Sequence, residues 1–265
     1  MRVMLSFLML CLTSCGGGTS QSALQPAQPV KTPIFNEPNG DFPLQNNQGK
    51  PPYSIVFFGN SHSTNIPTYL SLLFKANNSL PDVTIQRAPS IAFLSERLYE
   101  QESIDLLYSR RWTHAIFQAQ KYSQSGSTTY PTTAAELWIK RARSLQATPV
   151  LYPEHPQQGN TDEGQQLQSL HIGIASRSPA CIAPVGLVWD EFQIQYPNIV
   201  LHETDGNHAN IAGHILTSLV FYHVITGLDT KGLPAITELP IANDVFVKMK
   251  NVVDFIVAHQ PLCYM

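Results

Sequence analysis

Short apolar runs alternate with longer amphipathic segments along the chain from residue 53 onward. The apolar runs end near Gly, Pro or polar residues, which is typical of buried strands. In the longer segments, apolar residues recur at the spacing of one helix face. We expect strands at 53–58, 82–87, 114–118, 148–152 and 182–185. We expect helices at 66–76, 93–108, 133–145, 163–176, 210–226 and 241–258.

Strands and helices that alternate in this way form a parallel sheet with helices on both faces. The predicted fold class is therefore α/β, a three-layer α/β/α sandwich with a mostly parallel five-stranded sheet. In such sheets, ligands bind at the carboxyl ends of the strands. The segment Tyr152–Pro156 after the fourth strand, and the residues before the helix at 210–226, are therefore expected near a functional site.

The start of the chain reads as a targeting segment. Residues 3–12 form an apolar run after Arg2 that is too short to span a bilayer. The run ends in Leu12–Cys15, which resembles the lipobox of bacterial lipoproteins, and three glycines follow as a tether. The resemblance implies a signal peptide over 1–14 and a lipid on Cys15. The alternative is an ordinary secretory signal that is cleaved nearby.

A polar segment separates this start from the predicted domain. Residues 15–52 are rich in Ser, Gln, Pro, Gly and Asn and show no apolar periodicity, so we interpret them as the lipidated Cys15 and a flexible linker. The domain is expected at 53–265. We therefore expect an exported protein in the cell envelope, in which the lipid provides the only contact with the membrane.

Composition narrows the class of partner and the chemistry of the thiols. The net charge is −3 and no cluster of basic residues is visible, so no nucleic-acid partner is expected. Hydrophobic residues make up 43% of the chain, enough for one well-filled core.

Two cysteines remain in the predicted domain, Cys181 and Cys263, once Cys11 and Cys15 are assigned to the targeting segment. In an oxidising compartment they form a disulfide or stay as two buried free thiols.

A serine follows the first predicted strand in a position suited to a nucleophile. Gly59 allows a sharp turn, which would place Ser61 near the start of the next helix. There the Ser61 N–H points outward and the helix dipole favours developing negative charge. The competing interpretation is a serine that caps the helix and has no chemical role.

A second candidate segment lies before the helix at 210–226. Asp205 precedes His208 by three residues in one predicted loop, and Gly206 permits a tight turn between them. Such an Asp can hold one imidazole nitrogen and leave the other free to take a proton from a serine. His202 and His214 lie nearby without an Asp at this spacing, and we interpret both as structural or surface residues.

Together the two segments resemble blocks one and five of the SGNH (GDSL-like) hydrolase superfamily. Phe57–Ser63 resembles the block-one variant with Asn in place of Asp, and Asp205–Gly213 resembles block five. Ala183–Trp189 is also similar to the segment that these enzymes carry before block five. The resemblance covers about residues 53–228 and implies a flavodoxin-like fold. It implies a triad of Ser61, His208 and Asp205.

The sequence departs from the family pattern at two oxyanion-hole blocks. The block-two loop, Ala88–Leu94, lacks the family's glycine, so that Ser90 and Ala92 become the candidate backbone donors beside the Ser61 N–H. Block three normally supplies an Asn side chain. Here Gln118 is the first candidate for that amide and Gln120 the second. The alternative for both is a polar residue at a strand end.

The function that this pattern predicts is a serine esterase that acts on a short acyl ester, with an acetyl group on a carbohydrate as one candidate. The alternatives are an O-acyltransferase at the same site and a binding lipoprotein that has kept the fold without catalysis. We expect no cofactor. His202, Glu203, Asp205 and His208 match no closed metal-ligand spacing, so no metal is expected either. The sequence does not indicate the oligomeric state.

Overall fold

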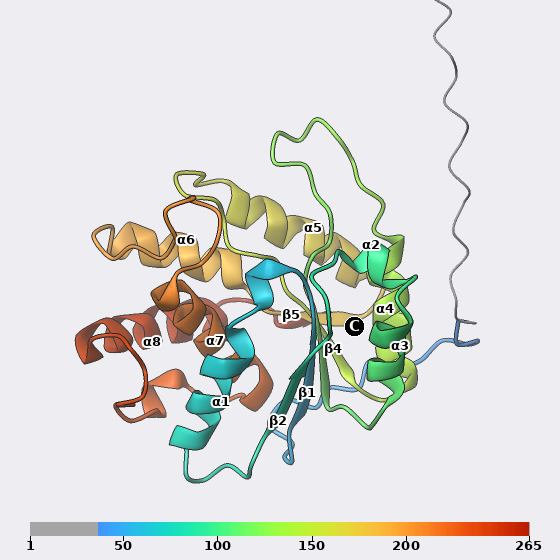
Figure 1. The fold of residues 1–265 in the computed structure, drawn as a ribbon, viewed down its shortest axis with the longest axis horizontal. Helices are drawn as coiled ribbons and strands as arrows, with labels where there is room; N and C mark the ends of the chain where they lie inside the picture. The colour runs from blue at the N-terminus through green and yellow to red at the C-terminus, as the bar shows by residue number, and fades with distance from the viewer. Residues whose placement is uncertain (1–36, 265) are drawn as a thin grey trace, which may run out of the picture. The chain divides into compact units, whose positions relative to one another are not determined.

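The computed structural model describes residues 37–264, and their fold is built on one six-stranded sheet (Figure 1). The strands lie in the order β2-β1-β3-β4-β5-β6, and all neighbours pair in parallel except β5 and β6, which are antiparallel. Their bounds are β1 Ser54–Phe58, β2 Thr84–Arg87, β3 His114–Phe117, β4 Thr148–Leu151, β5 Ala180–Ile182 and β6 Cys263–Tyr264. The α/β class and the parallel core are confirmed. The expected count of five strands was one too low, because the two-residue β6 is too short to leave a pattern in the sequence.

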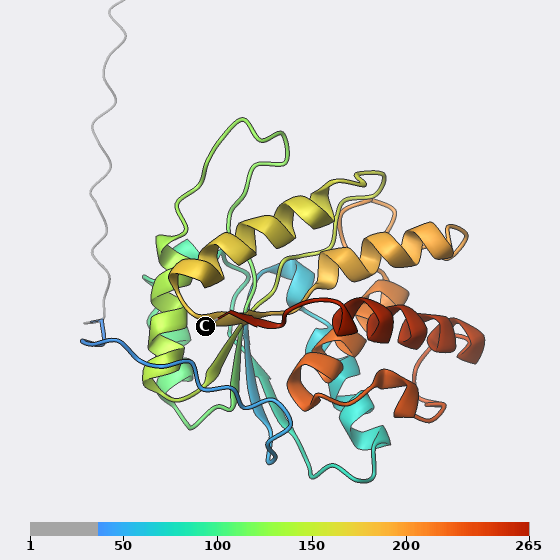
Figure 2. The same ribbon diagram turned by 180° about the vertical axis from the view of Figure 1, so that it is seen from behind.

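Helices cover both faces of the sheet, as Figures 1 and 2 show. In β1, Ile55 and Phe57 pack with the core that includes α1, α6, α7 and α8, whereas Val56 and Phe58 pack with the core that includes α2, α3 and α4. This alternation is the period of a strand, and it lets one buried strand supply both hydrophobic layers. The helix bounds are α1 Ile66–Ala76, α2 Leu94–Arg97, α3 Gln101–Tyr108, α4 Thr133–Ser144, α5 Glu163–Arg177, α6 Val185–Gln195, α7 Ile211–Thr226 and α8 Asn243–Ala258.

Two helical regions differ from the sequence prediction. The helix expected at 93–108 is split into α2 and α3, because the backbone of Glu100 is extended there (φ −110°, ψ 101°). The helix α6 was not predicted, and the strand expected at 182–185 instead ends at Ile182. Val188, Trp189 and Phe192 of α6 are all fully buried, and the segment shows little amphipathic contrast to mark it as a helix.

The helix α7 carries the second candidate segment at its start. The Asn210 side chain accepts a hydrogen bond from the Gly213 N–H (3.1 Å), which caps the helix. A Cβ on Gly213 would lie 2.4 Å from the Leu201 carbonyl oxygen and 2.5 Å from the Trp189 ring, so only glycine fits this approach. The helix is buried on nearly all sides from Gly213 to Thr226. Within 37–264, no helix combines the length and the apolar character needed to cross a bilayer.

Residues 37–52 differ from the flexible linker that we expected. Glu37 pairs with buried Arg141 (2.5 Å), and Asp41 pairs with Arg143 (3.1 Å). The Asn47 side chain donates to the Thr113 carbonyl oxygen at 2.9 Å. The segment is polar because it binds backbone and charged groups of the domain, so its composition gave no sign of packing. The proposed signal over 1–14 and Cys15 lie outside the described residues.

Cys181 and Cys263 form a disulfide, the first of the two alternatives that the sequence left open. The two cysteines are also opposite each other in the β5–β6 ladder. The bond and the ladder together attach the segment that follows α8 to the edge of the sheet.

Candidate active site

The candidate residues meet at the carboxyl ends of the central strands. Ser61 follows β1 in the short 3₁₀ turn Ser61–Ser63, and Gln118 directly follows β3. Glu154 lies in the loop after β4, and Asp205 and His208 lie in the loop before α7. Segments that are far apart in sequence therefore supply one site, at the edge where parallel sheets bind ligands.

Three side chains form a continuous chain of hydrogen bonds. Ser61 Oγ lies 2.9 Å from His208 Nε2, and His208 Nδ1 lies 2.6 Å from Asp205 Oδ2. These are the contacts that the resemblance implied for the three residues. The arrangement can carry a proton from the serine to the imidazole while the carboxylate fixes the tautomer of the ring.

Asp205 is held as a carboxylate by its own loop. Its Oδ1 accepts hydrogen bonds from the backbone N–H groups of Asn207 and His208, both at 2.9 Å. The hydrogen bond from the His208 side chain, followed by these two, lowers the pKa of Asp205 well below its usual range. Gly206 adopts φ +66°, the left-handed conformation that lets the loop turn back on itself.

The turn that carries Ser61 depends on a missing side chain. A Cβ on Gly59 would lie 2.5 Å from Gln118 Oε1 and 2.6 Å from Ser63 Oγ, so any larger residue would displace both side chains. The Asn60 side chain accepts the His62 N–H at 3.0 Å and closes the turn.

Neutral rings pack against His208. The ring of His62 stacks on that of His208 with 5.1 Å between centroids and 16° between planes. Burial, together with the nearby His208, lowers the pKa of His62 to about 4. Beyond it, His155 stacks on Trp189 at 4.0 Å, and burial lowers the pKa of His155 well below its usual range. At neutral pH, His62 therefore stacks on His208, and His155 lies beyond it, without adding a second positive charge.

His202 and His214 have the structural surroundings that we expected for them. His202 Nε2 lies 2.8 Å from the Pro156 carbonyl oxygen, and His214 Nε2 lies 3.2 Å from Asn65 Nδ2. Both rings are buried.

The Gln118 amide is oriented by its partners. Its Oε1 accepts the backbone N–H of Asn60 at 2.8 Å, so its Nε2 must face the other way. Nε2 donates to Glu154 Oε2 at 2.6 Å, which uses one of its two hydrogens. The sequence placed Glu154 near the site, in the segment after the fourth strand, but gave no sign that it would bind Gln118.

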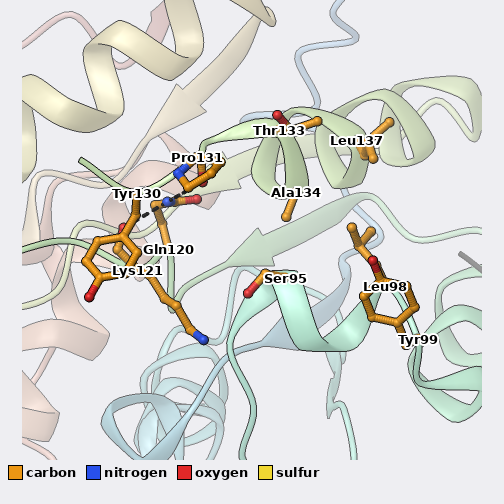
Figure 3. A pocket seen from close by; sticks show the side chains of 10 residues that line it. All are labelled: Ser95, Leu98, Tyr99, Gln120, Lys121, Tyr130, Pro131, Thr133, Ala134 and Leu137. Atoms are coloured by element: carbon orange, nitrogen blue, oxygen red, sulfur yellow. Dashed lines mark hydrogen bonds between the residues drawn. The ribbon is translucent and has the colours of Figure 1, made fainter. Parts of the chain in front are cut away.

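The Gln120 side chain binds backbone groups away from the turn that carries Ser61. Its amide nitrogen donates to the carbonyl oxygens of Lys121 (2.9 Å) and Pro131 (3.1 Å). Figure 3 shows it at one end of a cavity of about 520 Å³ between α2 and α4. Between the two candidate amides, only Gln118 touches the turn that carries Ser61.

Comparisons with solved structures show which fold this chain shares. No protein-family model matches the sequence, and no curated protein matches it. A candidate SGNH hydrolase from Slackia heliotrinireducens has a solved structure that matches with a TM-score of 0.51 and 21% identity, over 65% of this chain and 98% of that chain. The chain has the SGNH hydrolase fold. A DUF4886 family protein from Bacteroides uniformis matches with a TM-score of 0.64 and 12% identity, over 78% of this chain and 95% of that chain.

Within the SGNH fold, the block-two loop of this chain takes an unusual conformation. Ser90 adopts φ +62°, in the left-handed region that glycine enters freely. For other residues this region costs about 1–2 kcal/mol. Ser90 therefore holds a conformation that glycine would adopt at lower cost. Ala92 lies two residues further on and is partly exposed. The sequence gave no sign that Ser90 would be the left-handed residue.

A group of side chains outside the triad has the spacing of metal ligands. Within residues 37–264, the side chains grouped at ligand distance are those of His223, Asp229 and Asp254, in a different part of the chain. There Asp254 Oδ1 already accepts hydrogen bonds from the N–H and hydroxyl groups of Thr230.

The first prediction concerns Glu154. Burial raises its pKa to about 7, against hydrogen bonds from Gln118 and Tyr122 that favour the charged form. A folded pKa above the ordinary value near 4.5 contributes stability below pH 4.5, and this contribution is lost as the pH rises through 7. Relative to Glu154→Gln, the wild type should therefore become less stable between pH 5 and pH 8. Urea unfolding of both proteins at each pH measures the difference.

Glu102→Gln serves as the control, because Glu102 is exposed on α3. Its free energy of unfolding should follow that of the wild type across the same range. A difference between wild type and Glu154→Gln that does not change with pH would contradict the prediction.

Proposed function

We propose that the protein is a serine esterase. The observation that carries the proposal is the chain of hydrogen bonds from Ser61 through His208 to Asp205, at 2.9 Å and 2.6 Å. A structural serine at a turn does not need a histidine oriented by a carboxylate. The arrangement has the geometry of an activated nucleophile, with a base in reach and a third group that orients the base.

The mechanism is acyl transfer through a covalent intermediate. Ser61 Oγ attacks the ester carbonyl while His208 Nε2 takes its proton, and Asp205 stabilises the imidazolium that forms. The oxyanion is stabilised by the Ser61 N–H, by a backbone N–H of the Ser90–Ala92 loop and by the Gln118 amide hydrogen that Glu154 does not use. His208 then protonates the leaving alcohol, and water repeats the sequence to release the acid.

The substrate that we propose is a short acyl ester, such as an acetyl group, on a carbohydrate. The side chains of Asp205 and His208 are 50% and 41% exposed, so an alcohol as large as a sugar can approach them. Tyr99 and Tyr130 line the cavity between α2 and α4 with partly exposed rings, which offer the apolar faces and hydroxyl groups that suit sugars (Figure 3).

Two other functions use the same residues. An O-acyltransferase would pass the acyl group from Ser61 to a sugar hydroxyl in place of water. A binding protein would keep the fold without turnover. Reaction of the serine with a fluorophosphonate separates the last from the other two, because only an activated serine reacts. Products formed with and without an added sugar separate the first two.

The second prediction concerns the triad. Ser61→Ala and His208→Ala should each lower kcat for p-nitrophenyl acetate by roughly 10⁴–10⁶, and their combination should cost little more. Asp205→Asn should lose less, because the nucleophile and base remain. Fluorophosphonate labelling should disappear in Ser61→Ala.

The matched controls are Ser169→Ala on α5 and His259→Ala at the end of α8, both exposed. Wild-type protein that neither labels nor hydrolyses any short ester would leave the binding function.

The third prediction concerns the substrate. Tyr99→Ala and Tyr130→Ala should each raise KM for an acetylated oligosaccharide several-fold and leave p-nitrophenyl acetate hydrolysis unchanged, because only the larger substrate reaches the cavity. Phe255→Ala, an exposed aromatic residue on α8, is the control. Equal effects on both substrates would argue against a sugar at the cavity.

We also propose that the protein is exported and held in the cell envelope by a lipid on Cys15, which the segment Leu12–Cys15 supports. The lipid would be its only attachment to the membrane.

The fourth prediction tests this anchor. Cys15→Ala should move the protein from the membrane fraction to the soluble fraction when it is expressed in a bacterial host. Cys263→Ser, which breaks the Cys181–Cys263 disulfide without touching the start of the chain, should stay with the membranes. A Cys15→Ala protein that still sediments with membranes after a high-salt wash would contradict the proposal.

A further inference from the structure

A buried cation joins the turn that carries Ser61 to the block-two loop. The Arg97 side chain on α2 is fully buried. Its Nη2 donates to the carbonyl oxygen of Gly59 at 2.6 Å and to that of Ser90 at 3.3 Å, and its Nη1 donates to that of Pro89 at 3.0 Å. One guanidinium group therefore holds the backbone on both sides of the proposed oxyanion hole, as its planar set of donors allows.

Glu100 completes the contact from the other side. Its Oε2 pairs with Arg97 Nη1 at 2.9 Å, and its Oε1 accepts the hydroxyl of Ser90 at 2.5 Å. Ser103 lies between the two charges, accepts from Arg97 at 2.7 Å and donates to Glu100. The extended backbone of Glu100, which separates α2 from α3, places this carboxylate beside the loop.

Ser90 is thus held through both its carbonyl and its hydroxyl. Its φ of +62° is a conformation that glycine adopts unaided but that serine keeps only when its surroundings impose it. The Arg97–Glu100 pair supplies such surroundings, and it does so at the loop whose glycine the SGNH pattern leads one to expect.

We propose that Arg97 and Glu100 are positioning residues for the oxyanion hole. They hold Ser90 in the left-handed conformation and fix the loop at a set distance from the turn that carries Ser61. The loop's backbone N–H groups then face the oxyanion, as a glycine loop would present them. This inference rests on the esterase function proposed above.

The test is a double-mutant cycle between Glu100→Gln and Ser90→Gly. In the wild-type background, Glu100→Gln should lower kcat for p-nitrophenyl acetate about 10-fold or more with KM nearly unchanged, since a misplaced donor loses part of the ~10²–10³ that one donor contributes. In the Ser90→Gly background, the same substitution should change kcat less than about 3-fold, because glycine needs no support in this conformation. Equal losses in both backgrounds would overturn the proposal.

Deuterium uptake by the peptide that covers 88–93 gives a readout that does not depend on turnover. Uptake should rise in Glu100→Gln, which removes the negative charge that pairs with Arg97. It should also rise in Arg97→Lys, because an ammonium cannot reach all three carbonyl groups.

Uptake should not rise in the control Arg177→Lys, which alters an exposed Arg–Glu pair with Glu136. Unchanged uptake in Glu100→Gln would overturn the proposal even if the wild type proved inactive, and wild-type inactivity alone would contradict only the esterase function. If Arg97→Lys does not fold, Glu100→Gln still decides, because the Glu100 side chain is partly exposed.

Discussion

The close packing of Gly59 against the Gln118 side chain constrains the turn that carries Ser61. With no side chain on Gly59, Gln118 can reach back to the Asn60 N–H. A single Cβ would displace the Gln118 amide and the Ser63 hydroxyl together, and the Gly59 carbonyl of the same turn accepts a hydrogen bond from Arg97. The site is therefore one packed unit, in which the nucleophile turn and the proposed oxyanion groups constrain one another.

The ionisable groups around His208 have protonation states that favour a positive charge on this ring alone. Asp205 is stabilised as a carboxylate by three hydrogen bonds at an exposed position, whereas Glu154 is forced by burial toward a neutral form behind Gln118. The rings of His62 and His155 remain uncharged beside the base. The negative charge that stabilises an imidazolium thus lies next to His208, and competing positive charge is excluded from its neighbourhood.

The sequence was informative where a local rule decides the structure. Gly59, Ser61, Gly206 and Asn210 occupy turns and caps whose chemistry is visible in a few adjacent residues, and apolar periodicity located most strands and helices. It was silent where contacts come from distant segments. Arg97 is an ordinary arginine in a helical pattern until the fold buries it against Gly59 and Ser90. The helix α6 is apolar on too many sides to show a period, and the polar segment 37–52 gave no sign of the domain partners that hold it.

The pairing of β6 with β5 has a consequence for how the molecule is made. On a ribosome, β1 to β5 emerge in order, and β5 remains an open edge with unpaired backbone groups until residues 263–264 have been synthesised. The Cys181–Cys263 disulfide, a bond that needs an oxidising environment, then holds this edge closed. Closure of this edge of the sheet therefore depends on a two-residue strand that follows the other described elements in the chain.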